Sequence, residues 1–296
     1  MGKKKGGAAK AKKLARKAEQ EAIQKQVNVV KAAREAGSPL ASLPPMFTSF
    51  SRNGVDAALE FATPATLTQA DRASIHDMLD ENMAPVYGEG WTDAKSEKVK
   101  QLEEPETRLL LLRANAPASP ATSPASSPTK DEAKEDTPEK APSKSAELLG
   151  FLHFRFEIRE NAMLLGVHDL QVQKETQRKG VGKFLMMLSE MIAKRAGMGG
   201  AIASCQRANL DAMAFFKGIK YGLDAISPVN IHPTADDDEY NSELVSKVWD
   251  ADARQALDNY AAAEKKRLAG GGDGALRKEA EKAALHAARA NFGVWD

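Results

Sequence analysis

The chain has 296 residues, of which 42% are hydrophobic and 28% are charged, and its formal net charge is +1. That length can hold one large domain or two small ones. The single cysteine, Cys205, excludes an intrachain disulfide and a multi-cysteine zinc site, and we expect no bound metal. No apolar run approaches the roughly 20 residues of a transmembrane helix, so we expect no membrane partner.

Charge is distributed unevenly near the N-terminus. Residues 1–17 contain eight Lys or Arg residues and no Asp or Glu. Residues 8–36 are rich in Ala, Lys, Arg, Glu and Gln, which predicts a mostly solvated helix within a basic N-terminal extension over residues 1–45. Two interpretations stay open: a solvated tail, or a nuclear-targeting or nucleic-acid patch that could contact the ribosome.

The region from residue 46 to residue 248 alternates between strand-like and helix-like patterns. A turn and strand around residues 51–61 precede a stretch with helical apolar spacing, and the later segments repeat these two types. We predict a helix over 67–87, strands over 107–113, 148–156 and 162–173, a helix over 181–196, a strand over 201–206, a helix over 209–219 and a strand over 242–248. This order predicts one α+β domain.

Two other segments differ in composition. Residues 115–147 hold six prolines between Pro117 and Pro142 and no large apolar residue. Such a segment cannot bury enough surface to offset its ordering entropy, so we predict a disordered insertion. The C-terminal tail, residues 249–296, is rich in Ala, Lys, Glu and Arg, and we predict a loosely attached helix there.

Residues 177–183 (QRKGVGK) join a predicted strand to a predicted helix. A glycine costs about 1 kcal/mol in a helix relative to alanine, so Gly180 and Gly182 at a helix start require a reason. Unpaired backbone N–H groups and the helix dipole attract an anion to such a start, and glycines let a pyrophosphate approach the backbone. Arg178 and Lys179 add positive charge. The alternative is a tight turn with solvated cations.

Residues 177–182 also match the Gln/Arg-x-x-Gly-x-Gly/Ala signature of the GNAT superfamily of N-acetyltransferases, in the place where that fold has it. The segments FLHFRFEI, HDLQVQ, QRKGVGKFLM and N…AMAFF resemble, more narrowly, the histone-specific N-terminal acetyltransferases of this superfamily. The resemblance covers roughly residues 1–114 and 148–248. It implies a GNAT fold of the α+β class, with a mixed central sheet and helices on both faces.

The resemblance implies that acetyl-CoA is the co-substrate. In the GNAT fold the strand before the motif diverges from its neighbour and binds the pantetheine arm like an added strand. The residues implied are Leu170, Gln171 and Val172 for the pantetheine arm, Gln177, Arg178, Lys179, Gly180, Val181, Gly182 and Lys183 for the pyrophosphate, and Asn209 near the thiol. The side chains of Leu170 and Val172 can also pack in the core.

The catalytic pair implied by the resemblance is His168-Asp169, where the family has Tyr-Glu. Both side chains can take a proton, and the shorter aspartate favours relay through water. An α-amine has a pKa near 8, against about 10.4 for lysine, so a modest base suffices for an N-terminal acceptor. The alternative is a structural hydrogen-bond node. Met213 stands where the family has a tyrosine, so a phenolic acid is missing at that position.

Substrate-binding candidates come from aromatic and acidic positions. The family's acidic substrate contacts fall here on Ala162 and Met163, and only Glu157 and Glu160 remain near. Four consecutive carboxylates at residues 236–239 could receive a tail rich in arginine and lysine; the alternative is a solvated acidic loop. The residues expected to hold the acceptor are Tyr87, Trp91, His168, Ser204, Tyr240, Asp236, Asp237 and Asp238.

Together these expectations describe an N-terminal acetyltransferase that uses acetyl-CoA and acts on the histone four and histone two-A tails, which begin Ser-Gly-Arg-Gly. A lysine or small-amine acetyltransferase of the same fold is one alternative. A catalytically weak chromatin- or ribosome-binding module is another. We expect a monomer that is found in the nucleus and the cytoplasm.

Overall fold

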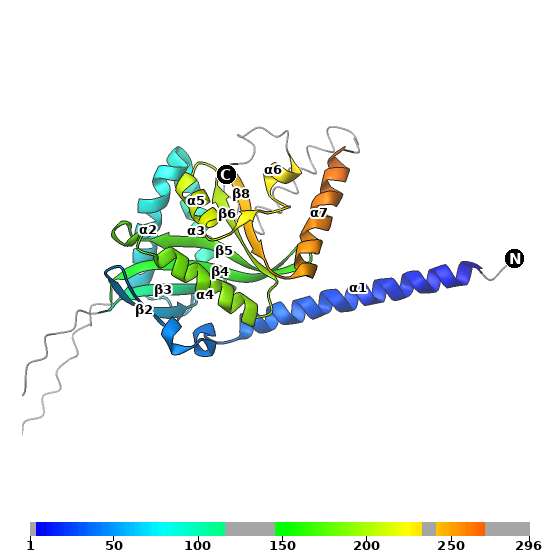
Figure 1. Cartoon of the computed structure of the whole chain (residues 1–296), viewed down its shortest axis with the longest axis horizontal. Coiled ribbons are helices and arrows are strands. Elements are labelled where there is room, and N and C mark those ends of the chain that lie inside the picture. The colour runs from blue at the N-terminus through cyan, green and yellow to red at the C-terminus, as the bar shows by residue number, and fades with distance from the viewer. Residues whose placement is uncertain (1–3, 116–145, 233–240, 270–296) are drawn as a thin grey trace, which may run out of the picture.

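The computed structural model of the chain describes residues 4–115, 146–232 and 241–269. Within these ranges, eight strands form one sheet in the order β1-β2-β3-β4-β5-β6-β8-β7 (Figure 1). Neighbouring strands are antiparallel except β5 and β6, which are parallel. The strands are β1 (Ser49–Arg52), β2 (Val55–Ala62), β3 (Arg108–Ala114), β4 (Leu148–Arg159), β5 (Ala162–Val172), β6 (Gly200–Gln206), β7 (Gly222–Leu223) and β8 (Ser242–Val248).

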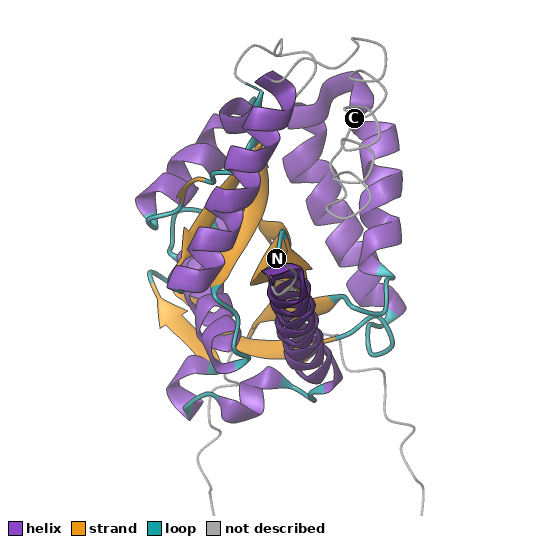
Figure 2. Ribbon diagram, turned by 90° about the vertical axis from the view of Figure 1, so that its right-hand side faces the viewer, coloured by secondary structure: helices purple, strands orange, loops and turns teal. Residues whose placement is uncertain are grey.

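Helices cover both faces of this sheet (Figure 2). The longer ones are α1 (Lys4–Glu35), α2 (Gln69–Tyr87), α3 (Trp91–Leu102), α4 (Val181–Arg195), α5 (Leu210–Gly218) and α7 (Ala251–Ala269), and none of them has the length and apolar character to span a bilayer. Because strand side chains alternate, Leu110 and Leu112 belong to the core cluster that includes α4, whereas Leu109 and Leu111 belong to the cluster that includes α2. The mixed sheet with helices on both faces confirms the predicted α+β fold.

The helix α1 is docked at one end and projects from the domain at the other (Figure 1). Val30 is buried in the same core cluster as Phe156. Arg34 Nε donates to the carbonyl oxygen of Phe156 at 2.8 Å, and Gln26 Nε2 donates to that of Asn161 at 2.8 Å. The last ten residues of the helix are therefore part of the domain, and the earlier ones extend beyond it.

The helix after β8 packs firmly on the sheet, which corrects the expectation of a loosely attached helix. Ala253, Leu257 and Ala261 are buried at four-residue intervals along α7. They lie in one core cluster with Ile202 of β6 and Leu164 of β5. Two of the three contacts are alanines, which allow close approach but give the sequence little apolar contrast. Residues 270–296 lie outside the described ranges.

Two regions between the predicted elements also bear on the site. The helix α3 was not predicted, and it adds a second helix beside α2 on the face opposite α4. The predicted disordered insertion lies outside the described residues except at its ends. These ends meet, since the N–H of Ala114 donates to the carbonyl of Glu147 at 2.9 Å.

Candidate active site

The strands β5 and β6 separate halfway along their length. Their parallel pairing covers only residues 164–167 of β5 and 200–203 of β6. Beyond it, β5 stays paired with β4, and β6 stays paired with β8. The edge of β5 over residues 168–172 therefore faces away from any described strand. An open edge of this kind can bind an extended chain through its backbone groups.

A β-bulge lies at the point of separation. Phe154 of β4 pairs with Val167 of β5, but His153 pairs with Asp169, so His168 is an extra residue in β5. One extra residue reverses the face to which the following side chains point. Asp169 therefore points to the α3 side of the sheet together with His153, and the residue after it packs on the α4 side.

A groove of about 710 Å³ runs along the open edge of β5 to the start of α4. This volume lies within the roughly 300–1,000 Å³ that is common for small-molecule and cofactor sites. The predicted site residues that line it are Tyr87, His168, Asp169, Leu170, Gln171, Val172, Gln177, Arg178, Gly180, Val181, Gly182, Lys183, Ser204 and Asn209. The fold thus brings the residues predicted for catalysis, and all but one of those predicted for the co-substrate, to one groove.

The start of α4 has the geometry of an anion site. Gly180 adopts φ +96°, a conformation that favours glycine, and its carbonyl accepts the first helical hydrogen bond, from Phe184 at 3.0 Å. The N–H groups of the first three helix residues therefore have no acceptor within the helix. A Cβ at Gly182 would stand 3.4 Å from two ring atoms of Phe215. The glycine thus keeps the groove open where an anion would approach the helix.

Two polar side chains of the motif already have partners. Arg178 pairs with Asp211 at 2.9 Å, and both side chains are exposed. An exposed ion pair is weak, so Arg178 can turn to a phosphate at little cost. Gln177 Nε2 donates to the carbonyl of Val172 at 3.1 Å and so closes the loop onto the end of β5.

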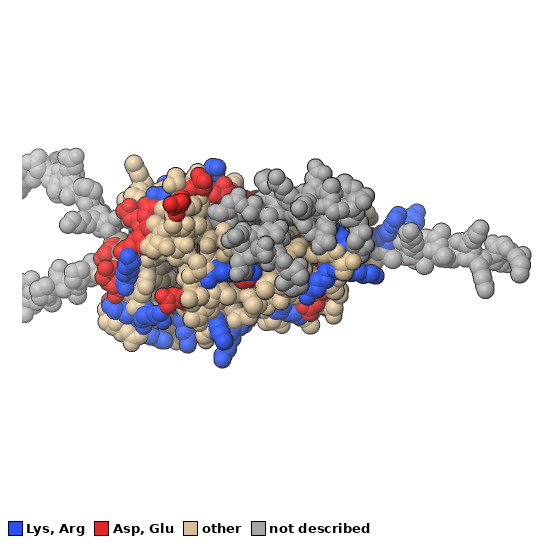
Figure 3. Space-filling view, turned by 90° about the horizontal axis from the view of Figure 1, so that it is seen from above, with Lys and Arg blue, Asp and Glu red and all other residues tan. Residues whose placement is uncertain are grey.

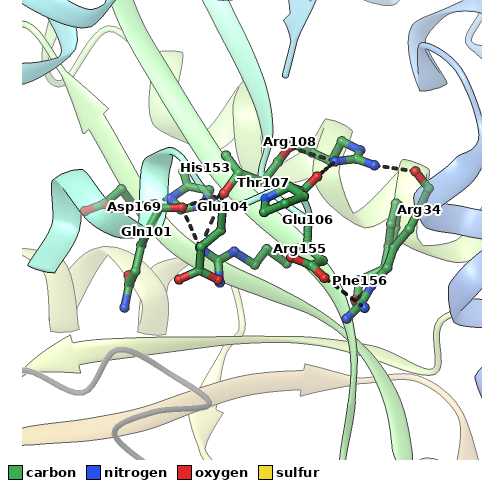
Figure 4. Close-up of polar contacts among 11 residues, drawn as sticks. Arg34, Gln101, Glu104, Glu106, Thr107, Arg108, His153, Arg155, Phe156 and Asp169 are labelled. Atoms are coloured by element: carbon green, nitrogen blue, oxygen red, sulfur yellow. Dashed lines mark hydrogen bonds and ion pairs between the residues drawn. The ribbon is translucent and has the colours of Figure 1, made fainter. Parts of the chain in front are cut away.

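A buried ion pair lies below the bulge. Lys98 of α3 donates to Asp169 Oδ1 at 2.6 Å, and the two side chains are only 3% and 2% exposed. On the other side, His153 Nδ1 lies 3.7 Å from Asp169 Oδ2. His153 Nε2 lies 3.0 Å from the hydroxyl of Thr107, which donates to the carbonyl of Gln101 at 2.6 Å. Figure 4 shows this network joining the loop after α3 to β4 and β5.

Burial and charge act in opposite directions on these groups. Burial alone would raise the pKa of Asp169, but the positive charge of Lys98 and the contact with His153 hold that pKa below its usual value. Burial lowers the pKa of His153, and it lowers the pKa of His168 well below the ordinary value for histidine. The two rings stack with their centroids 4.9 Å apart. Near neutral pH the site therefore holds an ionised Asp169 and two neutral imidazoles.

The opposite wall supplies a phenol. Tyr87 lines the groove at the end of α2, and burial raises the pKa of its hydroxyl although a hydrogen bond with Gln206 acts to lower it. The hydroxyl therefore stays protonated and can donate. Met213, which the resemblance aligns with a tyrosine, packs against the core. Tyr87 is thus the phenol that the described part of the groove offers.

The β6 side of the groove is less reactive. Burial raises the pKa of Cys205 to about 12, so its thiol stays neutral beside Ser204. Asn209 caps α5, since its Oδ1 accepts from the N–H of Ala212 at 3.0 Å. In the described ranges, no group of three or more His, Cys, Asp or Glu is arranged to hold a metal ion.

Two predicted site residues lie away from the groove. Trp91 packs between α2 and α3, where its Nε1 donates to Asp80 Oδ1 at 2.8 Å and its ring lies 5.6 Å from that of Tyr87. It therefore supports Tyr87 instead of lining the groove. Lys179 does not line the groove either, and its carbonyl accepts from Asn53 Nδ2 at 2.8 Å.

The acidic candidates are only partly described. Tyr240, Asp236, Asp237 and Asp238 lie outside the described residues, so their role stays a prediction. Glu157 pairs with Arg159 at 3.3 Å and does not line the groove. Glu160 does not line it either.

Sequence analysis missed the buried polar partners Lys98, Thr107 and His153. Lys98 lies four residues from both Ala94 and Leu102, on the buried stripe of α3. A lysine in the middle of an apolar helical stripe is the signal that could have found it, because lysine is almost never fully buried without a partner. His153 lies in a continuously buried run of β4 and gives no separate signal.

The divergent parallel strands and the glycine at the helix start agree with the α+β GNAT fold that the sequence resemblance implies. The model of the acetyltransferase (GNAT) family matches residues 117–221, about a third of the chain, which include β4, β5, α4, β6 and α5. The matched part of the chain is thus similar to the GNAT acetyltransferases. Acetyl-CoA as the co-substrate is consistent with this family match.

Similarities to solved structures are distant. A GNAT-family acetyltransferase from Listeria monocytogenes is 11% identical with a TM-score of 0.40, over 68% of this chain and 99% of that one. The PaiA N-acetyltransferase from Thermoplasma acidophilum, solved with coenzyme A, is 15% identical with a TM-score of 0.38, over 64% and 99%. A nourseothricin acetyltransferase is 17% identical with a TM-score of 0.30, and the match spans 48% of this chain and 64% of that one.

Proposed function

We propose that the protein transfers the acetyl group of acetyl-CoA to the N-terminal α-amine of a protein tail that begins Ser-Gly-Arg-Gly. The amine nitrogen bonds to the acetyl carbon, the carbon–sulfur bond breaks, and the proton that nitrogen loses is matched by the one that sulfur gains. The sequence resemblance to N-alpha-acetyltransferase D, which acetylates histone four and histone two-A, supports this acceptor. On this proposal the protein works in the cytoplasm and the nucleus.

The open edge of β5 is the observation that carries the proposal. Its backbone groups over residues 168–172 can bind the pantetheine arm as an added strand, and the adjacent start of α4 can bind the pyrophosphate. One N–H of that edge can face the thioester oxygen, on which negative charge grows as the amine attacks. The thioester would then lie at the bulge, beside His168 and Asp169.

The electrostatics of the bulge favour an α-amine over a lysine side chain. About a tenth of α-amines are neutral at pH 7, against well under 0.1% of lysine side chains. Asp169 is held ionised and His168 neutral, so both are weak bases. The buried Nε2 of His168 has no hydrogen-bond partner among the described residues, so it is available to take the amine proton. Weak bases suffice for an acceptor that is already partly neutral.

Surface charge is consistent with a basic acceptor. In Figure 3, acidic side chains gather on one side and basic side chains on the other, at the end of the molecule that carries α2 and the start of α4. Glu81 lines the groove and pairs with Lys174 at 3.2 Å. Exposed Glu89 and Asp93 have no ion-pair partner within the described residues. These carboxylates, and those predicted to act at residues 236–239, would attract the arginine and lysines of the tail.

Turnover of a Ser-Gly-Arg-Gly peptide tests the proposal. We expect mass spectrometry to find one acetyl group on the α-amine, and kcat/KM to fall when the third-position arginine becomes alanine. Acetylation of a lysine would favour the side-chain alternative. Binding of acetyl-CoA without turnover of any amine would favour the binding-module alternative.

We also propose that the projecting part of α1, residues 4–25, contacts a nucleic acid, such as ribosomal RNA. Lys10, Lys13, Arg16 and Lys17 are exposed there. Binding through phosphates would weaken steeply with salt. Deleting residues 1–20 should abolish RNA binding, measured by fluorescence anisotropy at two salt concentrations, and should leave peptide turnover unchanged. Equal RNA binding by the shortened chain would contradict this contact.

A further inference from the structure

The hydrogen bonds of Thr107 determine which nitrogen of His153 carries a proton. A threonine hydroxyl has one proton, and Thr107 donates it to the carbonyl of Gln101 at 2.6 Å, because a carbonyl can only accept. The hydroxyl oxygen must therefore accept from His153 Nε2, which lies 3.0 Å away. A neutral His153 thus carries its proton on Nε2 and has a lone pair on Nδ1.

That lone pair faces a second acceptor. His153 Nδ1 lies 3.7 Å from Asp169 Oδ2, and Lys98 occupies the other carboxylate oxygen. Neither Nδ1 nor Oδ2 has a hydrogen-bond partner among the described residues, and the two residues are 0% and 4% exposed. Two buried acceptors that face each other are unfavourable, and one proton between them would satisfy both. Their approach is set by the sheet, because the two residues pair across β4 and β5.

We propose that His153 is a positioning residue that acts through Asp169 and holds the proton of the attacking amine during acetyl transfer. This inference rests on the acetyl transfer proposed above. As the nitrogen–carbon bond forms, the amine proton passes to Asp169 Oδ2, directly or through His168, and on to His153 Nδ1. When the carbon–sulfur bond breaks, a proton returns along the same path to the leaving sulfur. The protein ends with the protons it began with.

The surroundings of His153 suit a temporary proton holder. The titratable and charged groups around it are Asp169 and His168 of β5, Lys98 of α3, Arg155 of β4, and Glu104, which pairs with Arg155 at 2.5 Å. Lys98 keeps Asp169 ionised, so the carboxylate passes a proton on instead of keeping it. The carboxylate stabilises an imidazolium, whereas burial and the nearby cations oppose it, so His153 can give the proton back.

The tautomer of His153 can be read without turnover, from ring-nitrogen NMR shifts of labelled protein. We expect a protonated Nε2 and an unprotonated Nδ1, with His153→Gln used to assign the signals. Thr107→Val removes the acceptor of Nε2–H and should let the proton move to Nδ1, whereas Thr107→Ser should keep it on Nε2. A wild-type His153 protonated on Nδ1 would overturn the proposal, because that nitrogen would already donate to Asp169.

Kinetics separate proton holding from a purely structural role. His153→Gln can still donate toward Thr107 but cannot take a proton. It should lower kcat about tenfold to a hundredfold, leave the KM for acetyl-CoA unchanged and remove one transition from the pH profile of kcat. Thr107→Val should lower kcat with His153 intact, and Thr107→Ser should recover most of that loss. A folded His153→Gln variant with the wild-type kcat and pH profile would overturn the proposal.

Asp169→Asn tests the path itself. It keeps the shape of the side chain and removes the carboxylate, so kcat should fall at least tenfold. A smaller loss would overturn the path through Asp169 and assign the proton to His168 or solvent. These comparisons hold for any amine that the protein acetylates, and the NMR experiment needs none. Failure of the acceptor assignment can therefore be told apart from failure of the relay.

Discussion

The two ends of the groove differ in the groups that form them and in how deeply those groups are buried. At the start of α4, backbone N–H groups, two glycines and exposed cations form the candidate anion site, and its ion pair between Arg178 and Asp211 is open to solvent. Below the bulge, the buried side chains of Lys98 and Asp169 are each held by the other. A side chain at the first end can be replaced with little loss in the free energy of unfolding. At the second end, removal of either Lys98 or Asp169 leaves the other charge buried without its partner, which lowers the free energy of unfolding.

Lys98→Met should have the largest effect on stability. It leaves the Asp169 carboxylate buried without its cation, which costs about 3–5 kcal/mol. Lys95→Met is the matched control, because Lys95 lies in the same helix as Lys98 and pairs with the partly exposed Asp80 of α2, where about 1 kcal/mol or less is expected. Urea unfolding of both variants at pH 7 measures the difference. Equal losses would show that the buried pair is no stronger than the exposed one.

The same variant should reverse the pH dependence that Asp169 contributes. In the wild type the pKa of Asp169 lies below its unfolded value of about 3.9, so its contribution is full above that pH and is lost as pH falls through the folded pKa. Without Lys98, burial raises this pKa above the unfolded value, and the folded variant gains by taking up a proton. The stability gap between variant and wild type should therefore narrow from pH 7 to pH 5. A gap independent of pH would contradict this assignment.

Gly182→Glu should weaken acetyl-CoA binding about a hundredfold, or roughly 3 kcal/mol, while the fold is kept. The side chain would meet the Phe215 ring and bring negative charge to the anion site. Gly182→Ala is the control, and it should cost less because it adds a methyl group without charge. Calorimetry with acetyl-CoA measures both. Unchanged acetyl-CoA binding by Gly182→Glu would contradict the placement of the phosphates at the start of α4.

Arg178→Ala should have a smaller effect, a rise of a few-fold in the Kd for acetyl-CoA that shrinks as salt is added. The guanidinium is exposed, so its attraction to a phosphate is screened by solvent and ions. Titrations at low and high ionic strength check this. A loss as large as that of Gly182→Glu would mean that the side chain, and not the backbone, forms the anion site.

Deleting residues 117–143 and bridging the gap with a short Gly/Ser linker should have the smallest effect. The sequence of that segment has no large apolar residue, and the strands on either side already meet, with Arg113 paired to Leu148. We expect the melting temperature and peptide turnover to stay nearly unchanged. A drop of several degrees would show that the segment contributes to the packing of the domain.

The difference between the two ends also explains what the sequence could predict. The candidate anion site lies within residues 177–183, so local spacing and glycine chemistry were enough to propose it. The buried network joins Lys98 to Asp169, 71 positions apart, and it depends on a one-residue bulge that aims Asp169 at α3. No local pattern encodes such a register shift. The sequence could propose His168 and Asp169 as candidate site residues, but it could not predict their buried partners.

The projecting part of α1, residues 4–25, determines how far the tip of the helix lies from the domain. At about 1.5 Å per residue, the 22 residues before Gln26 reach about 33 Å beyond the docked end. Figure 1 shows this free end directed away from α2 and α5, which border the groove. A partner bound to the tip of α1 would therefore leave the entrance of the groove unobstructed. The protein could therefore stay bound to that partner through α1 while successive protein tails enter and leave the groove.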